Sequence, residues 1–212
     1  VIIYPMPNNP NPQGKGLVPL LQGLDRHRLG RLLPPKQIEQ VEMELFTSMF
    51  VLQSEFCFNP VPNRAYFLYQ KEGVFRLLLV APHEWGSTPY QGRFIGSCIL
   101  HDDRTWTLAL DPAMEHDKDF MAHIVCEQNK LQRALEHADT LVDILPVFVE
   151  NFSYYGRILA FILGKSLSIS MDMAGIKSLT YNEARGLLFM DKTNDKANEM
   201  PHEMFHEMAH EQ

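Results

Sequence analysis

The chain of 212 residues predicts an α+β fold: a four-stranded antiparallel meander flanked by an N-terminal helix and a C-terminal set of helices. Between about residues 64 and 110, apolar and polar residues follow the short alternation of strands. On both sides of this region, apolar residues recur at the three- and four-residue spacing of helices. The links between the expected strands are too short for the crossovers that parallel strands require, so we expect antiparallel pairing.

The first helix is expected over about residues 35–55. Pro34 and Pro35 suit the first turn of a helix, where a missing backbone N–H costs nothing. Apolar side chains then share one helical stripe: Ile38, Val41, Leu45, Met49 and Leu52. The prolines and asparagines of residues 59–63 end this helix and turn the chain toward the sheet.

The strands are expected over residues 64–71, 74–81, 93–101 and 104–110. Gly73 supplies a tight turn within the first pair, and Asp102 and Asp103 form the turn of the second pair. In a meander, His83 and Glu84 would lie at one end of the sheet and His101 at the other. We therefore interpret these polar residues as loop and turn residues and not as members of one catalytic or metal-binding site.

Helices are expected again over about residues 116–190, with an interruption at Pro146. Gly156 and Gly164 allow close contact between helices, and Thr180 followed by Glu183 predicts a capping box at the start of the last helix. Residues 17–190 therefore form one expected globular domain. An extended arm rich in proline and asparagine (1–16) precedes it, and an acidic, histidine-bearing tail (191–212) follows it.

Composition excludes several classes of protein. With 45% hydrophobic residues the chain is too apolar for general disorder, and with a net charge of −7 it is too acidic for a non-specific nucleic-acid coat. Its three cysteines are an odd number without a C-x-x-C pair, which favours a cytoplasmic protein over a disulfide scaffold. Residues 1–16 lack the pattern of a signal peptide, and no apolar run is long enough to span a membrane.

The tail contains the metalloprotease pattern H-E-x-x-H twice, at residues 202–206 and 206–210. Written in fours, however, the tail is a tetrapeptide repeat, and a repeat of E-M-x-H generates this pattern at every junction. We therefore expect a solvated tail and no catalytic residues. Zinc, nickel or copper binding is the alternative, with candidate ligands at His202, His206 and His210 and on the predicted helix at His116 and His123. No other cofactor is expected.

A stretch from about Pro60 to Leu108 resembles the domain-of-unknown-function family 2452. The resemblance is carried by Tyr66, Leu68, Tyr69, Pro82, Glu84, Trp85, Gly96, Leu100, Asp103 and Trp106. It implies the sheet but no established activity. Its tryptophans and tyrosines, without a recurrent catalytic dyad, resemble a binding or scaffolding module more than an enzyme.

Two functions remain open. The first is a non-enzymatic interaction or regulatory module that binds a protein partner or a second copy of itself. Its candidate contact residues are the aromatic side chains Tyr66, Tyr69, Trp85 and Trp106 and the basic side chains Arg26, Arg28 and Arg31. Packing in the core is the alternative for the aromatic residues, and a solvated helix face is the alternative for the arginines. The second function is a metal-binding protein or metal-dependent hydrolase that uses the histidine-rich tail.

Overall fold

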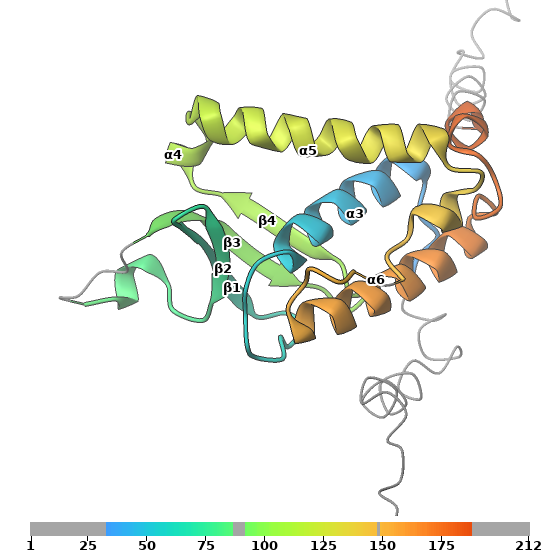
Figure 1. Ribbon diagram of the computed structural model, residues 1–212. Coiled ribbons are helices and arrows are strands. Elements are labelled where there is room, and N and C mark those ends of the chain that lie inside the picture. Colours follow the sequence, from blue (N-terminus) through green and yellow to red (C-terminus); the bar gives the residue numbers. More distant parts are fainter. Residues whose placement is uncertain (1–32, 87–91, 148, 188–212) are drawn as a thin grey trace, which may run out of the picture.

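The structure is a computed structural model and describes residues 33–86, 92–147 and 149–187. It confirms the α+β class (Figure 1). The elements are α3 (Ile38–Leu52), β1 (Ala65–Lys71), β2 (Val74–Leu78), η1 (Pro82–Glu84), β3 (Arg93–Leu100), β4 (Trp106–Leu110), α4 (Pro112–Glu115), α5 (Lys118–His137), η2 (Leu141–Ile144) and α6 (Tyr154–Met173). A last helix covers residues 181–187.

The four strands are antiparallel, as predicted, but they do not follow one another in the sheet as the strands of a meander would. The order is β2-β1-β3-β4, so β3 pairs with the free edge of β1 instead of with β2. The link between β2 and β3, residues 79–92, is long enough to pass β1. Tyr69 on β1 and Trp85 in this link are in ring contact, with centroids 6.1 Å apart, which anchors the link against the sheet.

This strand order also corrects the prediction that His83 and Glu84 lie at the opposite end of the sheet from His101. Ile99 near the end of β3 pairs with Ala65, and Leu78 at the end of β2 pairs with Phe67. Both strands therefore finish at the end of the sheet where β1 begins. At that end, Asn63 Nδ2 donates to Asp102 at 3.1 Å, and His101 Nε2 lies 3.1 Å from Thr107 Oγ1. These contacts are those of turn residues, as the sequence indicates.

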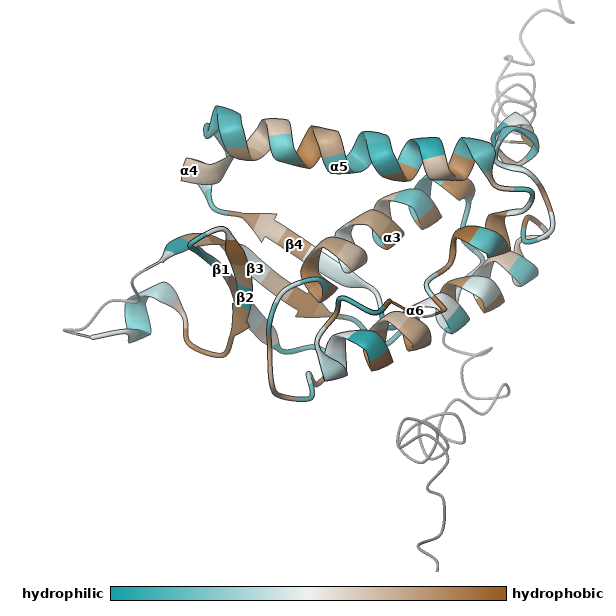
Figure 2. Cartoon of the chain, viewed as in Figure 1, coloured by the Kyte–Doolittle hydropathy of each residue, from teal (hydrophilic) through white to brown (hydrophobic). Residues whose placement is uncertain are grey.

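One face of the sheet carries the core. Tyr66, Leu68, Leu77, Leu100 and Trp106 are buried on it, and α3 packs between this face and α6 (Figure 1). Figure 2 shows the strands as largely hydrophobic and much of α5 as hydrophilic. None of the helices in the described ranges combines the length and apolarity needed to cross a membrane.

The helix before the sheet begins later than predicted. Residues 33–37 are extended, Gln37 is the N-cap, and α3 starts at Ile38. Pro34 and Pro35 therefore precede the helix instead of forming its first turn. In this extended segment the Pro34 carbonyl accepts a hydrogen bond from Ser170 Oγ of α6 at 2.9 Å. The segment thus fixes the start of α3 against α6.

The close helix contact predicted for two glycines of α6 is confirmed at one of them. A Cβ on Gly156 would lie 2.8 Å from the carbonyl oxygen of Leu52, the last residue of α3. A Cβ on Gly164 would lie 2.7 Å from the carbonyl oxygen of Pro146, which is not in a helix. At the last helix, the Thr180 backbone N–H donates to Glu183 at 2.8 Å, and the Glu183 N–H donates to Thr180 Oγ1 at 3.3 Å. This is the predicted capping box.

Candidate interaction surface

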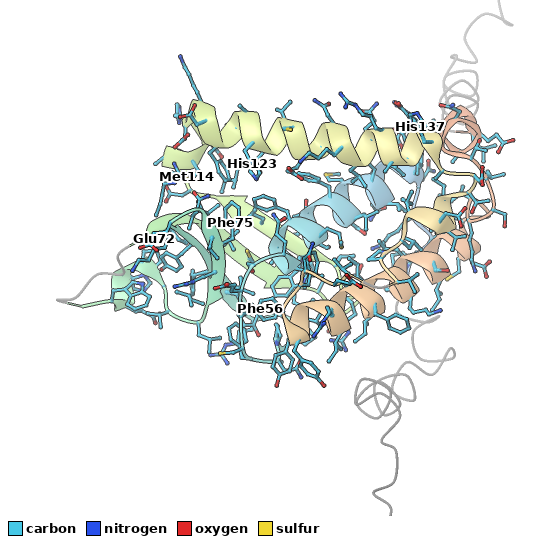
Figure 3. All side chains as sticks on the ribbon, viewed as in Figure 1. Phe56, Glu72, Phe75, Met114, His123 and His137 are labelled. Carbon is cyan, nitrogen blue, oxygen red and sulfur yellow. The ribbon has the colours of Figure 1, made fainter. Side chains whose placement is uncertain are left out.

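Helix α5 is fixed at its N-terminal end. Asp117 caps the helix by accepting a hydrogen bond from the Phe120 N–H at 2.8 Å. Arg93 of β3 makes an ion pair with Asp117, donates to Gln70 at 2.8 Å and lies 5.8 Å from the centre of the Phe120 ring. On the next turn, His123 stacks on Phe75 of β2 with the ring centroids 6.3 Å apart; both residues are labelled in Figure 3.

The middle of α5 has no buried side chain. Ile124 and Leu135 are buried, but every residue from 125 to 134 is exposed or half-buried. Between these two anchors the helix passes beside α3 and leaves two hollows, which share Phe46, Phe50 and Leu131 as lining residues. We call the two hollows together the α3–α5 cleft.

The first hollow, termed the acidic hollow, has a volume of about 420 Å³. Its lining residues are Glu39, Glu42, Met43, Phe46, Thr47, Phe50, Leu108, Leu110, Ile124, Gln128, Asn129, Leu131 and Gln132. None of these described lining residues is basic. Glu42 accepts a hydrogen bond from Tyr181 at 3.0 Å, whereas Glu39 is exposed and makes no ion pair within the described part of the chain. Met43 is 64% exposed at the rim.

The second hollow, termed the neutral hollow, has a volume of about 380 Å³. Its lining is mostly apolar: Leu45, Phe46, Met49, Phe50, Leu131, Ile144, Val149 and Phe152, together with Gln53, Glu127 and Lys130. The two charged lining residues, Glu127 and Lys130, pair with each other at 2.6 Å. Because their charges compensate, this hollow offers apolar contact without a net charge.

A third hollow lies beside strand β2 and contains the predicted contact residue Trp85. This Trp85 pocket has a volume of about 470 Å³ and is lined by Glu55, Phe56, Cys57, Phe58, Arg76, Leu77, Leu78, Leu79, Val80, Trp85 and Ser153. Leu79 is 44% exposed in it. At its edge, Glu55 and Arg76 form an ion pair at 3.2 Å.

The structure does not bring the four predicted aromatic residues onto one exposed surface, because the sheet separates them. Tyr66 and Trp106 lie on the helix-covered face, where their rings contact each other at 5.6 Å and both are buried. The Trp106 indole N–H is buried and has no hydrogen-bond partner in the described residues. These two rings belong to the core and offer no contact surface.

Tyr69 and Trp85 lie on the opposite face. The Trp85 indole N–H donates to the Tyr69 hydroxyl at 3.0 Å, and that hydroxyl donates to the Val80 carbonyl at 3.0 Å. Tyr69 is buried beneath this link, whereas Trp85 stays half-buried. Of the four aromatic candidates, Trp85 is therefore the one whose ring reaches a described hollow.

The predicted metal ligands do not come together where the structure describes them. His116 ends α4, with its Nδ1 atom 2.8 Å from the Pro112 carbonyl, and His123 stacks on Phe75. Over residues 33–86, 92–147 and 149–187, no group of three or more His, Cys, Asp or Glu side chains could hold a metal ion. His202, His206 and His210 lie outside the described residues, as do Arg26, Arg28 and Arg31.

A buried ionic cluster was missed by the sequence analysis. Lys36 is only 1% exposed, and its Nζ atom lies 2.5 Å from Glu44 and 2.6 Å from Asp103. Asp103 does form a turn, since it accepts hydrogen bonds from the Thr105 N–H and hydroxyl, and its carbonyl accepts one from Ser166. The cluster thus joins the β3–β4 turn to α3 and α6 and has a structural role.

The cysteines in the described ranges are unpaired. Cys57 and Cys126 are exposed, and Cys98 is buried on β3. Burial raises the pKa of the Cys98 thiol to about 12, so this side chain behaves as an apolar core residue.

Comparison with known proteins agrees with the resemblance and extends it. Residues 36–128 match the family model described as "Protein of unknown function (DUF2452)", a segment that runs from Lys36 through most of α5. An uncharacterized protein of Caenorhabditis elegans, C08B11.9, is 42% identical over 48 residues. That alignment covers 22% of this chain and 26% of the worm protein, so it spans about a quarter of the relative's length. No solved structure matches the chain.

Proposed function

We propose that the protein is a non-enzymatic interaction or regulatory module, and that its α3–α5 cleft binds a protein partner. The observation that carries this proposal is the middle of α5, which passes beside α3 over two hollows without burying a side chain between Ile124 and Leu135. Apolar hollows of this size between helices are common binding sites, and a surface of exposed apolar residues is typical of protein contacts.

The lining indicates the chemistry of the partner. Phe46, Phe50 and Leu131 provide an apolar floor common to both hollows, and Met43 adds an exposed apolar side chain at the rim. Glu39 and Glu42 make the rim of one hollow acidic. The best-suited partner therefore presents apolar side chains flanked by lysine or arginine, as an amphipathic helix does in a hydrophobic groove.

The test is affinity capture with matched variants of the full chain. Met43→Lys places a charge at the apolar rim and neutralises the neighbouring Glu39, one helical turn away. Val61→Lys is the control, because Val61 is 56% exposed and lies outside the three described hollows. We expect a partner held by the original chain and by the control to be lost from Met43→Lys, while all three chains have the same melting temperature. Leu79→Lys examines the Trp85 pocket in the same way.

A cytoplasmic location belongs to this proposal. The odd number of cysteines supports it, because an oxidising compartment would leave one thiol without a partner. Self-association is one form of the proposed binding. If mass spectrometry identifies the captured protein as a second copy of this chain, the cleft is a self-association surface.

Metal binding by the tail is the second candidate, favoured by the fourfold spacing of His202, His206 and His210. On a helix, adjacent members of this series share one side and can chelate a transition metal. Calorimetric titration of the full chain with zinc and nickel tests it. We expect saturable binding that disappears when all three histidines are changed to asparagine. Absence of binding in both chains, or equal binding in both, contradicts a metal site in the tail.

A further inference from the structure

We propose that residues 17–32 of this same chain dock in the acidic hollow of the α3–α5 cleft. This inference rests on the proposed function, since it takes the cleft to be a binding surface. Three properties identify residues 17–32 as the occupant of the acidic hollow: the charge of the hollow, the composition of the segment and the distance that the chain must span.

The acidic hollow selects for a basic and apolar occupant. Its floor is made by half-buried or buried apolar side chains from three elements, including Phe46 of α3, Leu108 of β4 and Ile124 of α5. Glu39 is exposed at the rim and has no ion pair within the described residues. An arginine brought to this rim would therefore gain a carboxylate that no described group already occupies.

Residues 17–32 have this composition. Seven of them are leucine or valine: Leu17, Val18, Leu20, Leu21, Leu24, Leu29 and Leu32. Three arginines, Arg26, Arg28 and Arg31, stand against the single acid Asp25. The apolar residues concentrate in the first half of the segment and the arginines in the second. The first half thus matches the floor of the hollow, and the second half matches its acidic rim.

The chain can make this connection within one molecule. The described chain begins at Leu33, which is buried, and Pro34 is bonded to Ser170 of α6. Glu39 follows six residues after Leu33, so the two lie within about 20 Å of each other at full extension. The seven residues 26–32 can span about 23 Å. They therefore suffice to return the chain from Leu33 to the rim and leave residues 17–25 for the floor.

The acidic tail is the competing segment, and charge excludes it. Residues 191–212 contain Asp191, Asp195, Glu199, Glu203, Glu207 and Glu211 but only Lys192 and Lys196. Placing them in the hollow would bring further carboxylates toward Glu39 and Glu42, with no basic lining residue in the described part to compensate. Of the two ends of this chain, residues 17–32 are the complementary one.

Hydrogen–deuterium exchange of the full chain tests the docking without requiring a partner. We expect the triple variant Leu20→Ser, Leu21→Ser, Leu24→Ser to take up deuterium at least threefold faster in peptides covering residues 39–46 and 125–134. Peptides covering β3 serve as the internal control and should not change, which shows that the domain remains folded. Equal exchange in the variant and the original chain would overturn the docking.

A charge exchange identifies the rim contact. Changing Arg26, Arg28 and Arg31 to glutamate should increase exchange at residues 125–134, and adding Glu39→Arg to that variant should restore protection. Glu115→Arg, an exposed acid on α4, is the matched control and should restore nothing. Rescue by both substitutions, or by neither, would contradict a specific contact at Glu39.

Two further readings separate this inference from the proposed function and from self-association. Protection should not depend on protein concentration over a hundredfold range, because the contact lies within one chain; protection that rises with concentration would assign the hollow to a second copy and overturn the inference. Partner capture by Met43→Lys tests the proposed function, whereas deuterium uptake in the leucine variant tests the docking. If capture depends on Met43 while exchange is unaffected by the leucine substitutions, the cleft binds a partner but residues 17–32 do not dock in it.

Discussion

Lys36 is the residue whose environment departs most from what its type suggests. Its side chain is 1% exposed and lies between the carboxylates of Glu44 and Asp103, which are 21% and 17% exposed. A buried lysine is tolerated when carboxylates compensate its charge, and removal of one member of such a group leaves the others without compensation. The cluster thus makes the extended segment before α3 dependent on the β3–β4 turn.

Lys36→Met should lower the free energy of unfolding by about 3 kcal/mol, because Glu44 and Asp103 would face each other without a cation. Chemical denaturation measures the change. The control is Lys130→Met, which removes an exposed ion pair with Glu127 and should cost less than about 1 kcal/mol. Similar losses in the two variants would show that the buried cluster contributes no more than a surface pair.

The same cluster predicts a pH dependence. Burial favours the neutral form of Asp103, but hydrogen bonds from Lys36 and Thr105 and the charge of Lys36 outweigh burial and hold the pKa of this carboxyl below its ordinary value. A lowered pKa in the folded state stabilises the protein above the unfolded-state pKa of about 4, and that contribution disappears as the pH falls through the folded-state pKa. The stability difference between the original chain and Lys36→Met should therefore narrow below about pH 4. A constant difference from pH 7 to pH 3 would contradict this.

Among the elements, α5 shows what periodicity can and cannot predict. Helical spacing predicts one long apolar stripe over Phe120, Ile124, Leu131, Leu135, Ala138, Val142 and Leu145. Its first four residues mark the side of α5 that faces the core, but α5 ends at His137 and the last three residues lie beyond it. The spacing does not predict that Leu131 remains half-buried. How deeply a side chain is buried depends on the distance to the facing element, and here the N-terminal anchor at Arg93 and the packing of Leu135 set that distance.

Two helical glycines provide a matched test of packing at the element scale. Alanine is favoured over glycine within a helix by about 0.5–1 kcal/mol, so both Gly164→Ala and Gly186→Ala gain this contribution. A Cβ on Gly186 meets nothing within 4 Å, whereas one on Gly164 would lie 2.7 Å from the Pro146 carbonyl oxygen. We expect Gly186→Ala to raise the melting temperature and Gly164→Ala to lower stability by about 1–3 kcal/mol. Stabilisation by both substitutions would show that α6 does not pack tightly on residue 146.

For the whole molecule, local sequence patterns predicted the positions of the strands but not which strands pair with each other. All four strands begin within two residues of where alternation placed them, although β2 ends at Leu78 and not at residue 81. The capping box of Thr180 and Glu183 caps the last helix. The strand order was wrong because only a tight turn, such as that at Gly73, specifies which strands pair. The link over residues 79–92 carries no such signal. The aromatic contact between Tyr69 and Trp85, which anchors it, joins positions 16 residues apart.

The candidate site was less predictable because it also depends on contacts between residues that are far apart in the sequence. Trp85, one of the predicted contact residues, lines a hollow. The α3–α5 cleft, in contrast, is formed by residues that individually have the pattern of ordinary core or surface positions. Lys36 carries no signal of burial, since its partners stand 8 and 67 positions away. Both features depend on how α3, α5 and the β3–β4 turn meet in space.

We propose that the α3–α5 cleft binds a protein. The most direct test of this binding is the amount of partner retained by Met43→Lys relative to Val61→Lys, with both chains equally folded. We predict a reduction of at least tenfold, because the substitution places a charge on the apolar rim. Equal retention by the two chains would contradict the claim and assign the contact to another surface.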